Sequence, residues 1–495
     1  MTDTAIVERL ASEAVPAQQH LIDGRRVPSA DGRTLQVESP RNGEILTTIA
    51  SGTARDVDKA VAAARQAFES GVWSAMPPAE RKKVLMRLAD LIDDHRYELA
   101  VLGVRDNGTE IGMALKAEPG SAAGTFRYYA EAADKTEGAV APAGPGHLGL
   151  ILRQPVGIAG VIVPWNFPLM IGSWKIAPAL AVGNSVVLKP SENASLALLR
   201  IAELALEAGV PDGVFNVVTG KGQVVGEAIG MHNDIDVIAF TGSGFVGRKL
   251  LEYAARSNLK KVYLELGGKS PNVVFSDCPD IDKAAAAAVN GIFRNSGQVC
   301  VAGSRLLLEQ GIHDEFVEKV RIGAERLRVG DPLDAQSDIG AINSGEQLSK
   351  NLEYVAIAES EGAQRVTGGD RVNESSGGYY MAPTIFKNVD CDMRIAQEEV
   401  FGPVLGVMSF QSENDAVRIA NSTAYGLAAG VWTSDLGRAH RMIQKIESGV
   451  VHVNCYGGAE ITLPLGGLKQ SGNGHDKSMH ALDKFTSLKS AWISL

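Results

Sequence analysis

Apolar residues along the chain follow two different spacings, and the change between them divides the sequence. Between Asp56 and Leu99 they recur at helical spacing, in DVDKAVAAARQAF and PAERKKVLMRLADLIDDHRYEL, and Asp56 is placed to cap the first helix. From Gly157 onward, short apolar runs such as GIAGVIVP, NSVVLKP and DVIAFTGS alternate with helical stretches such as SLALLRIAELALEAG. This alternation of strands and helices predicts an α/β fold with a parallel sheet.

A second α/β series begins at about Gly268, with PNVVFSD, IDKAAAAAVNGIFRN, SRLLLEQ and IHDEFVEKVRIGAERL. We therefore expect two lobes, for which 495 residues are ample. Residues near 125–153 and the tail ALDKFTSLKSAWISL fit neither lobe. The apolar Trp492 and Ile493 in this tail predict burial in a subunit contact.

Composition narrows the range of functions. The formal net charge of -10 argues against a nucleic-acid or anionic-lipid partner and favours a small-molecule substrate. The four cysteines are widely spaced without a CxxC pair, which suggests neither a disulfide framework nor a structural zinc site. Neither a secretory leader pattern nor an apolar run of 18 residues occurs, so we expect a cytoplasmic protein that does not enter a membrane.

Three candidate catalytic residues lie near the ends of the apolar runs. Cys300 ends GQVC between a predicted helix and a predicted strand, although an isolated cysteine is more often a small buried apolar residue than a nucleophile. Glu265 closes the strand KKVYLEL and is either an ion-paired strand end or a general base with a raised pKa. Asn166 lies between the two prolines of VPWNFP and is either a turn residue or a donor to an oxyanion.

Two further motifs suggest nucleotide contacts. KPSE, residues 189–192, directly follows a strand, at the position that meets the adenosine ribose in nucleotide-binding sheets, where Glu192 can accept hydroxyl hydrogen bonds. FTGSGFVG, residues 240–247, follows another strand and opens a helix, so its glycines let the backbone approach a pyrophosphate. KPSE alone also fits an ordinary turn, and FTGSGFVG is not a GxGxxG motif and is weak evidence by itself.

Taken in order, VPWNFP, KPSE, FTGSGFVG, ELGGK, GQVC, EEVFGP and LPLGGLKQSGNG resemble the aldehyde dehydrogenase family from about residue 20 to the end. The resemblance implies a Rossmann-like NAD-binding domain (1–124 and 154–267) and a catalytic α/β domain (268–474). It also implies a small β excursion (125–153 and 475–495) that joins subunits into dimers or tetramers. NAD is the expected cofactor and NADP is possible, because Glu192 would repel a 2′-phosphate that Lys189 can tolerate; no metal is expected.

The resemblance also implies residue roles. Cys300 matches the nucleophile, Glu265 the base that activates water, Asn166 the oxyanion donor, and Lys175 a lysine of a proton relay. The implied cofactor contacts are Ile162, Pro164, Trp165, Lys189, Glu192, Gly222, Gly242, Ser243, Val246, Gly247, Leu266, Glu399 and Phe401. The implied substrate tunnel comprises Met170, Trp174, Val299, Val301, Tyr456, Glu460 and Leu465.

The tail GGLKQSGNGHDKSMHALDKFTSLKSAWI resembles the branch of the family that oxidises γ-glutamyl-γ-aminobutyraldehyde and related aminoaldehydes. We therefore expect an ω-aminoaldehyde substrate, with Glu460 near the tunnel mouth either attracting the amine or merely solvated. Leu266, Leu465 and His475 depart from the usual alanine, phenylalanine and arginine of that branch, so a broad aliphatic or aromatic aldehyde dehydrogenase is the alternative.

Three other functions compete with this interpretation. A coenzyme-A-acylating relative commonly lacks the basic glutamate, so Glu265 argues against it. A cysteine esterase would use Cys300 without any redox cofactor, and a non-enzymatic descendant would bind nucleotide without turnover.

Overall fold

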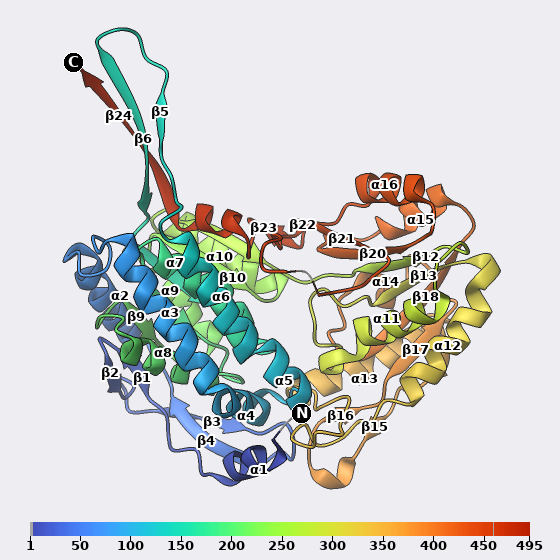
Figure 1. Ribbon diagram of the computed structural model, residues 1–495. Helices are drawn as coiled ribbons and strands as arrows, with labels where there is room; N and C mark the ends of the chain where they lie inside the picture. Colours follow the sequence, from blue (N-terminus) through green and yellow to red (C-terminus); the bar gives the residue numbers. More distant parts are fainter. Residues whose placement is uncertain (1–2, 459) are drawn as a thin grey trace.

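The computed structural model describes residues 3–458 and 460–495 and consists of two lobes, with a three-stranded arm projecting from the first (Figure 1). Both lobes contain a largely parallel sheet with helices packed on it, which confirms the predicted α/β class. Within the described residues, no helix combines the length and the apolar character needed to cross a bilayer.

The sheet of the first lobe has the strand order β2-β1-β9-β8-β7-β10-β11-β23. Its parallel core is β7 (Ile158–Ile162), β8 (Ser185–Lys189), β9 (Phe215–Val217), β10 (Val237–Thr241) and β11 (Lys261–Glu265). The antiparallel edges are β1 (His20–Ile22), β2 (Arg25–Val27) and β23 (Gly472–Asn473). Every residue of β7, β8 and β10 is buried, which explains their continuous apolar sequences.

The first lobe is covered mainly by helices. They are α1 (Thr4–Ser12), α2 (Ala54–Glu69), α3 (Pro78–Asp94), α4 (Arg96–Asn107), α5 (Ile111–Ala117), α6 (Pro119–Ala132), α7 (Pro168–Ala181), α8 (Leu196–Ala208), α9 (Glu227–Met231) and α10 (Gly244–Arg256), with the short helix η1 (Gly222–Gly226) and the hairpin β3 (Thr34–Glu38) and β4 (Ile45–Ala50). Asp56 does not cap α2 as predicted. The cap is Thr53, three residues earlier, and the buried Asp56 carboxylate accepts a 3.0 Å hydrogen bond from the Thr53 backbone N–H.

The sheet of the second lobe has the strand order β14-β17-β18-β13-β12-β20-β21. These strands are β12 (Pro271–Val274), β13 (Arg305–Glu309), β14 (Gln364–Thr367), β17 (Thr384–Lys387), β18 (Val404–Phe410), β20 (Ala428–Trp432) and β21 (Val450–Val453). The helices are α11 (Ile281–Phe293), α12 (His313–Glu325), α13 (Gly345–Ser360), α14 (Arg394–Gln397), α15 (Glu413–Ala420) and α16 (Leu436–Lys445). The short elements are β15 (Arg371–Val372), β16 (Tyr380–Met381), β19 (Tyr425–Gly426), β22 (Leu468–Lys469), η2 (Arg294–Gly297), η3 (Gln310–Ile312) and η4 (Glu374–Ser376). The short helix η5 (Met479–Lys484) packs against α7 of the first lobe.

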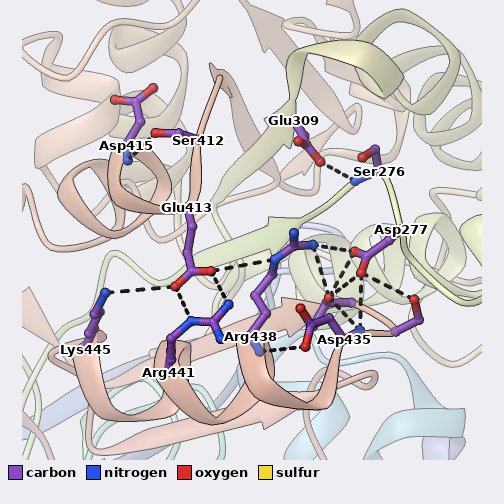
Figure 2. Close-up of polar contacts among 12 residues, drawn as sticks. Ser276, Asp277, Glu309, Ser412, Glu413, Asp415, Asp435, Arg438, Arg441 and Lys445 are labelled. Carbon is purple, nitrogen blue, oxygen red and sulfur yellow. Dashed lines mark hydrogen bonds and ion pairs between the residues drawn. The ribbon is translucent and has the colours of Figure 1, made fainter.

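A network of charged side chains fixes α15 and α16 to the end of β12 (Figure 2). Arg438 donates to Asp277 at 2.8 Å, and its guanidinium carbon lies 4.4 Å from the centre of the Phe275 ring. Arg441 donates to both carboxylate oxygens of Glu413, at 2.8 and 2.7 Å. The network therefore holds two helices of the second lobe in place.

The arm consists of β5 (Ala139–Ala141), β6 (His147–Pro155) and β24 (Thr486–Ser494), in the order β24-β6-β5. Both segments of the arm begin later than the predicted residues 125 and 475. Residues 119–132 form α6, which packs against α3 and α7, and Phe485, just before β24, is completely buried. Val140, Leu488 and Trp492 are exposed on the arm in the single chain. Residues 472–473 also pair with β11, so the chain returns to the first lobe before the arm.

Candidate active site

The turn that carries Cys300 is held in a left-handed backbone conformation. Asn295, Ser296 and Gly297 have φ angles of 49°, 55° and 72°. A Cβ on Gly297 would lie 2.1 Å from the carbonyl oxygen of Gly402, so only glycine fits there. The Asn295 amide group is buried and donates to the Asn166 carbonyl at 3.2 Å. The turn thus fixes Cys300 relative to the loop that carries Asn166.

Asn166 and Cys300 line one pocket of about 180 Å³, between β7 and α7 on one side and η2 on the other. The Asn166 Nδ2 donates to the Gln298 carbonyl at 2.9 Å. An amide nitrogen carries two hydrogens, so the second N–H can serve another acceptor. The Asn166 Oδ1 is buried and has no hydrogen-bond partner among the described residues.

Glu265 ends β11 and is 7% exposed. Its Oε1 has no hydrogen-bond partner within the described part of the chain. Burial raises the pKa of the Glu265 carboxyl well above its usual range, and the nearby Asp476 carboxylate raises this pKa further, against the opposing effect of two lysines. Such a carboxyl group exchanges its proton at a higher pH than an exposed glutamate.

A buried charge cluster lies beside Glu265; it contains the expected Lys175 and two residues, Asp476 and Lys484, that the sequence analysis missed. The ammonium groups of Lys175 and Lys484 each donate to one oxygen of Asp476, and these three side chains are at most 4% exposed. Burial opposes ionisation of Asp476, but the two lysines outweigh it and lower the pKa of Asp476. Only the unremarkable polar stretch GHDKS could have signalled this cluster from the sequence.

The Cys300 side chain is a thiol in this state. Burial raises the pKa of Cys300 to about 12, the carboxylates of Glu399 and Glu265 add to the effect, and the Val301 N–H and Arg294 oppose it. The thiolate is the reactive form of cysteine, so a base is needed to generate it.

The pocket that contains Cys300 has groups suited to the pyrophosphate and nicotinamide end of a dinucleotide. Gly242 and Ser243 line it where the 13-residue helix α10 begins, and Ser243 caps this helix, so the helix N-terminus can receive a phosphate. The Thr241 hydroxyl is buried and has no hydrogen-bond partner among the described residues. Glu399 accepts from the Gly268 N–H at 3.0 Å, and a Cβ on Gly267 would lie 2.2 Å from the Glu399 Oε2. The backbone at Gly267 can therefore lie this close to the Glu399 carboxylate only because residue 267 is a glycine.

Of the other expected cofactor residues, four line this pocket and six lie outside its lining. Pro164, Trp165, Leu266 and Phe401 line it, and the Trp165 and Phe401 rings meet edge to face at 5.3 Å. Lys189 ends β8 and forms a 2.8 Å ion pair with Glu192, next to Gly222. Ile162 ends β7, whereas Val246 and Gly247 lie in the first turn of α10.

A second cavity, of about 230 Å³, also reaches Cys300. Among its walls are five of the expected tunnel residues: Met170, Trp174, Val299, Val301 and Leu465. The prediction for Tyr456 differs from the structure, since its ring packs against Gly291, Gly303 and Gly430 and its hydroxyl donates to the Val301 carbonyl at 3.0 Å. Glu460 is exposed and does not line this cavity within the described part of the chain. The cavity is instead lined by three polar residues that the sequence analysis missed: Arg294, His452 and Lys477.

Known proteins share both the sequence and the fold. A model described as "Aldehyde dehydrogenase family" matches residues 27–491. The "NADP/NAD-dependent aldehyde dehydrogenase PuuC" of Escherichia coli (strain K12) is 48% identical over 474 residues, 96% of this chain and 95% of that protein.

Two solved structures are also close to this one. The γ-glutamyl-γ-aminobutyraldehyde dehydrogenase from Burkholderia cenocepacia J2315 has 48% identity and a TM-score of 0.97, with 99% of each chain covered. An indole-3-acetaldehyde dehydrogenase complexed with NAD+ has 46% identity and a TM-score of 0.99, with 100% of each chain covered. These matches confirm the resemblance: the chain belongs to the aldehyde dehydrogenase family and is an NAD(P)-dependent oxidoreductase that acts on aldehydes.

Proposed function

We propose that the chain oxidises its aldehyde to a carboxylic acid through a thioester on Cys300. The observation that supports this most directly is the convergence of Cys300 and Asn166 on one pocket, with the electrostatic influence of Glu265 on the thiol. Glu265, directly or through a water, removes the thiol proton, and the thiolate attacks the aldehyde carbon. The Asn166 amide and the Cys300 backbone N–H donate to the resulting oxyanion.

Loss of hydride from this tetrahedral adduct leaves the thioester. When bound, the nicotinamide cofactor supplies the hydride acceptor, and Glu399, Phe401, Gly242, Ser243 and Thr241 are the residues placed to hold it. Glu265 first releases the thiol proton to solvent and then takes a proton from water, whose oxygen attacks the thioester carbon. Glu265 returns this second proton to the leaving thiolate. The acid leaves, and Cys300 is restored as the thiol.

We assign the cluster of Lys175, Asp476 and Lys484 a positioning role in both proton transfers. Its two cations and one carboxylate stand within electrostatic reach of Glu265 and have opposite effects on the Glu265 pKa. A proton relay through Lys175 requires its ammonium to give a proton to Asp476 before it accepts one from Glu265, and the hydrogen bond from Lys175 to Asp476 provides for that first transfer.

For the substrate, we propose an aminoaldehyde whose amine is acylated, such as γ-glutamyl-γ-aminobutyraldehyde. A structural neighbour that carries this substrate in its name shares 48% identity and supports the proposal. The alternative is a broad range of aliphatic or aromatic aldehydes. It is supported by the similarity to an indole-3-acetaldehyde enzyme and by the apolar cavity residues Phe167, Trp174 and Leu465.

We also propose that the arm joins copies of this chain into a dimer or tetramer. Its strand β24 carries the exposed apolar side chains of Leu488, Trp492 and Ile493, and such residues favour burial against another protein surface. The Trp492 ring stacks on His147 of β6, which gives the arm a flat aromatic surface.

The first test is NADH or NADPH absorbance with γ-aminobutyraldehyde, its γ-glutamyl conjugate, simple aliphatic aldehydes and benzaldehyde, each with NAD and with NADP. The proposal predicts the highest kcat/KM for the γ-glutamyl conjugate with NAD. Dominance of aliphatic or aromatic aldehydes would support the alternative. Ester hydrolysis without nucleotide, together with no aldehyde oxidation, would contradict the redox function altogether.

A further inference from the structure

Arg294 lines the substrate cavity and forms no ion pair with any of the described residues. It follows α11, stands six positions before Cys300, and lines both the cavity of about 230 Å³ and a wider cleft of about 770 Å³. Its Nε is buried and has no hydrogen-bond partner, and no carboxylate of the described residues lies within ion-pair distance of its guanidinium. Its Nη1 would lie 3.1 Å from a Cβ on Gly457, so the guanidinium packs against this glycine.

Keeping a charged side chain largely out of contact with water has a free-energy cost. Burial lowers the pKa of Arg294, yet a guanidinium stays protonated in proteins because its intrinsic pKa is so high. Arg294 is half-buried, with its Nε out of contact with water, and a partly desolvated charge without an ion-pair partner destabilises the fold. Its presence beside the reacting thiol therefore indicates a partner supplied by a ligand.

The cavity contains no compensating anion. Its charged lining residues are Arg294 and Lys477, and no aspartate or glutamate lines it within the described part of the chain. The Lys477 ammonium lies 5.8 Å from the Trp174 ring centre, and the exposed Glu460 acts on Lys477 from outside the cavity. Burial lowers the pKa of His452, so this imidazole is neutral. Glu110 lines the wider cleft only, and burial raises its pKa.

We propose that Arg294 is a specificity residue that binds a carboxylate at the far end of the aldehyde substrate. The planar guanidinium fits a carboxylate through two parallel hydrogen bonds. The carboxylate would lie where the cavity and the wider cleft meet, because Arg294 and Met113 line both. This inference rests on the proposed oxidation at Cys300. It narrows the aminoaldehyde class to members whose amine is masked and which carry a carboxylate, and it disfavours aldehydes with a free ω-ammonium group.

The test uses three aldehydes of matched length: an ω-carboxyaldehyde, the unsubstituted aldehyde, and an ω-trimethylammonio aldehyde, which cannot cyclise. Chain lengths of four to six carbons are compared by kcat/KM with NAD. We expect the wild type to prefer the carboxylate over the cation by at least about tenfold. In Arg294→Met the ratio of kcat/KM for carboxylate to that for neutral aldehyde should fall about 10- to 100-fold, as for a lost charge-assisted hydrogen bond. The loss should appear mainly in KM, because the distal contact is the same in the ground and transition states.

Two control variants separate charge from geometry. Arg294→Lys retains the cation without the planar fork and should give an intermediate ratio. Arg326→Met removes an exposed arginine that lines the wider cleft but not the substrate cavity, so it should leave the ratio unchanged.

A binding measurement tests Arg294 independently of turnover. Glutarate should protect Cys300 of the wild type from iodoacetamide at a concentration at least about tenfold lower than valerate does, and Arg294→Met should abolish the difference. Equal protection by the two acids, or a wild type that prefers the cationic aldehyde, would overturn the inference. Oxidation of none of the aldehydes would contradict the proposed function, whereas the protection ratio would still report on Arg294.

Discussion

Replacing Asp476 with asparagine leaves the buried ammonium groups of Lys175 and Lys484 without their shared carboxylate. Removing one partner of a buried ion pair costs about 3–5 kcal/mol, because the remaining charge stays desolvated. In Lys484→Met, Asp476 still pairs with Lys175, so the loss should be smaller. In the double variant, which combines Lys484→Met with Asp476→Asn, only the Lys175 ammonium is left without a carboxylate. The free energy of unfolding should therefore decrease in the order wild type, Lys484→Met, double variant, Asp476→Asn.

The same two single variants should change catalysis in opposite directions. Asp476 raises the pKa of Glu265 and Lys484 lowers it. Asp476→Asn should therefore let Glu265 ionise at a lower pH, and the acid limb of the kcat profile should move to lower pH. Lys484→Met should move this limb to higher pH, because Glu265 acts as a base only when ionised.

Both parts are measured on the same protein samples. Denaturant titration gives the stability order, and NADH production between pH 5.5 and 9 gives the acid limb. Lys283→Met, at an exposed position of α11, is the matched control and should change neither. The reasoning is refuted if the two variants move the limb in the same direction, or if the double variant is less stable than Asp476→Asn.

Three other predictions concern the oxyanion, the cofactor and the arm. Asn166→Ala should lower kcat by about 10²–10³-fold with little change in KM, since one oxyanion donor is lost; an unchanged NADH burst rate in stopped flow would argue against this role. Glu192→Gln should raise kcat/KM for NADP relative to NAD by up to about fivefold, because a partly exposed charge contributes about 0.2–1 kcal/mol; an unchanged ratio would place the 2′-phosphate elsewhere. Leu488→Asp combined with Trp492→Asp should shift the protein to a smaller species in size-exclusion chromatography with light scattering, and an unchanged oligomer would exclude the arm as the contact.

The sequence predicted the strands well where burial makes their pattern continuous. Val186, Val187 and Leu188 in β8 are fully buried, so nearly every position there is apolar and the strand can be read directly. The first residue of α2 was harder to predict from the sequence, because Thr53 and Asp56 are both good capping residues and only the backbone geometry distinguishes them.

The candidate site was predictable where it depends on linear motifs. Cys300 and Asn166 lie in such motifs, and the structure brings both to one pocket. Asp476 and Arg294 could not be recognised, because a polar tail and a basic residue at a helix end are both ordinary on a surface. Their importance follows from burial, which depends on contacts between distant segments: Asp476 meets Lys175 across 301 positions of the chain.

The most direct test of the thioester mechanism is a single-turnover experiment with Glu265→Gln. The variant is mixed with NAD and aldehyde and quenched with acid, and both the NADH formed and the mass of the peptide that contains Cys300 are measured. The mechanism predicts that about one NADH per active site forms slowly, because Glu265 also takes the thiol proton, and that the acyl group then stays on Cys300, because removal of the base blocks hydrolysis of the thioester. Steady turnover by Cys300→Ala, or an acyl group on any other residue, would contradict it.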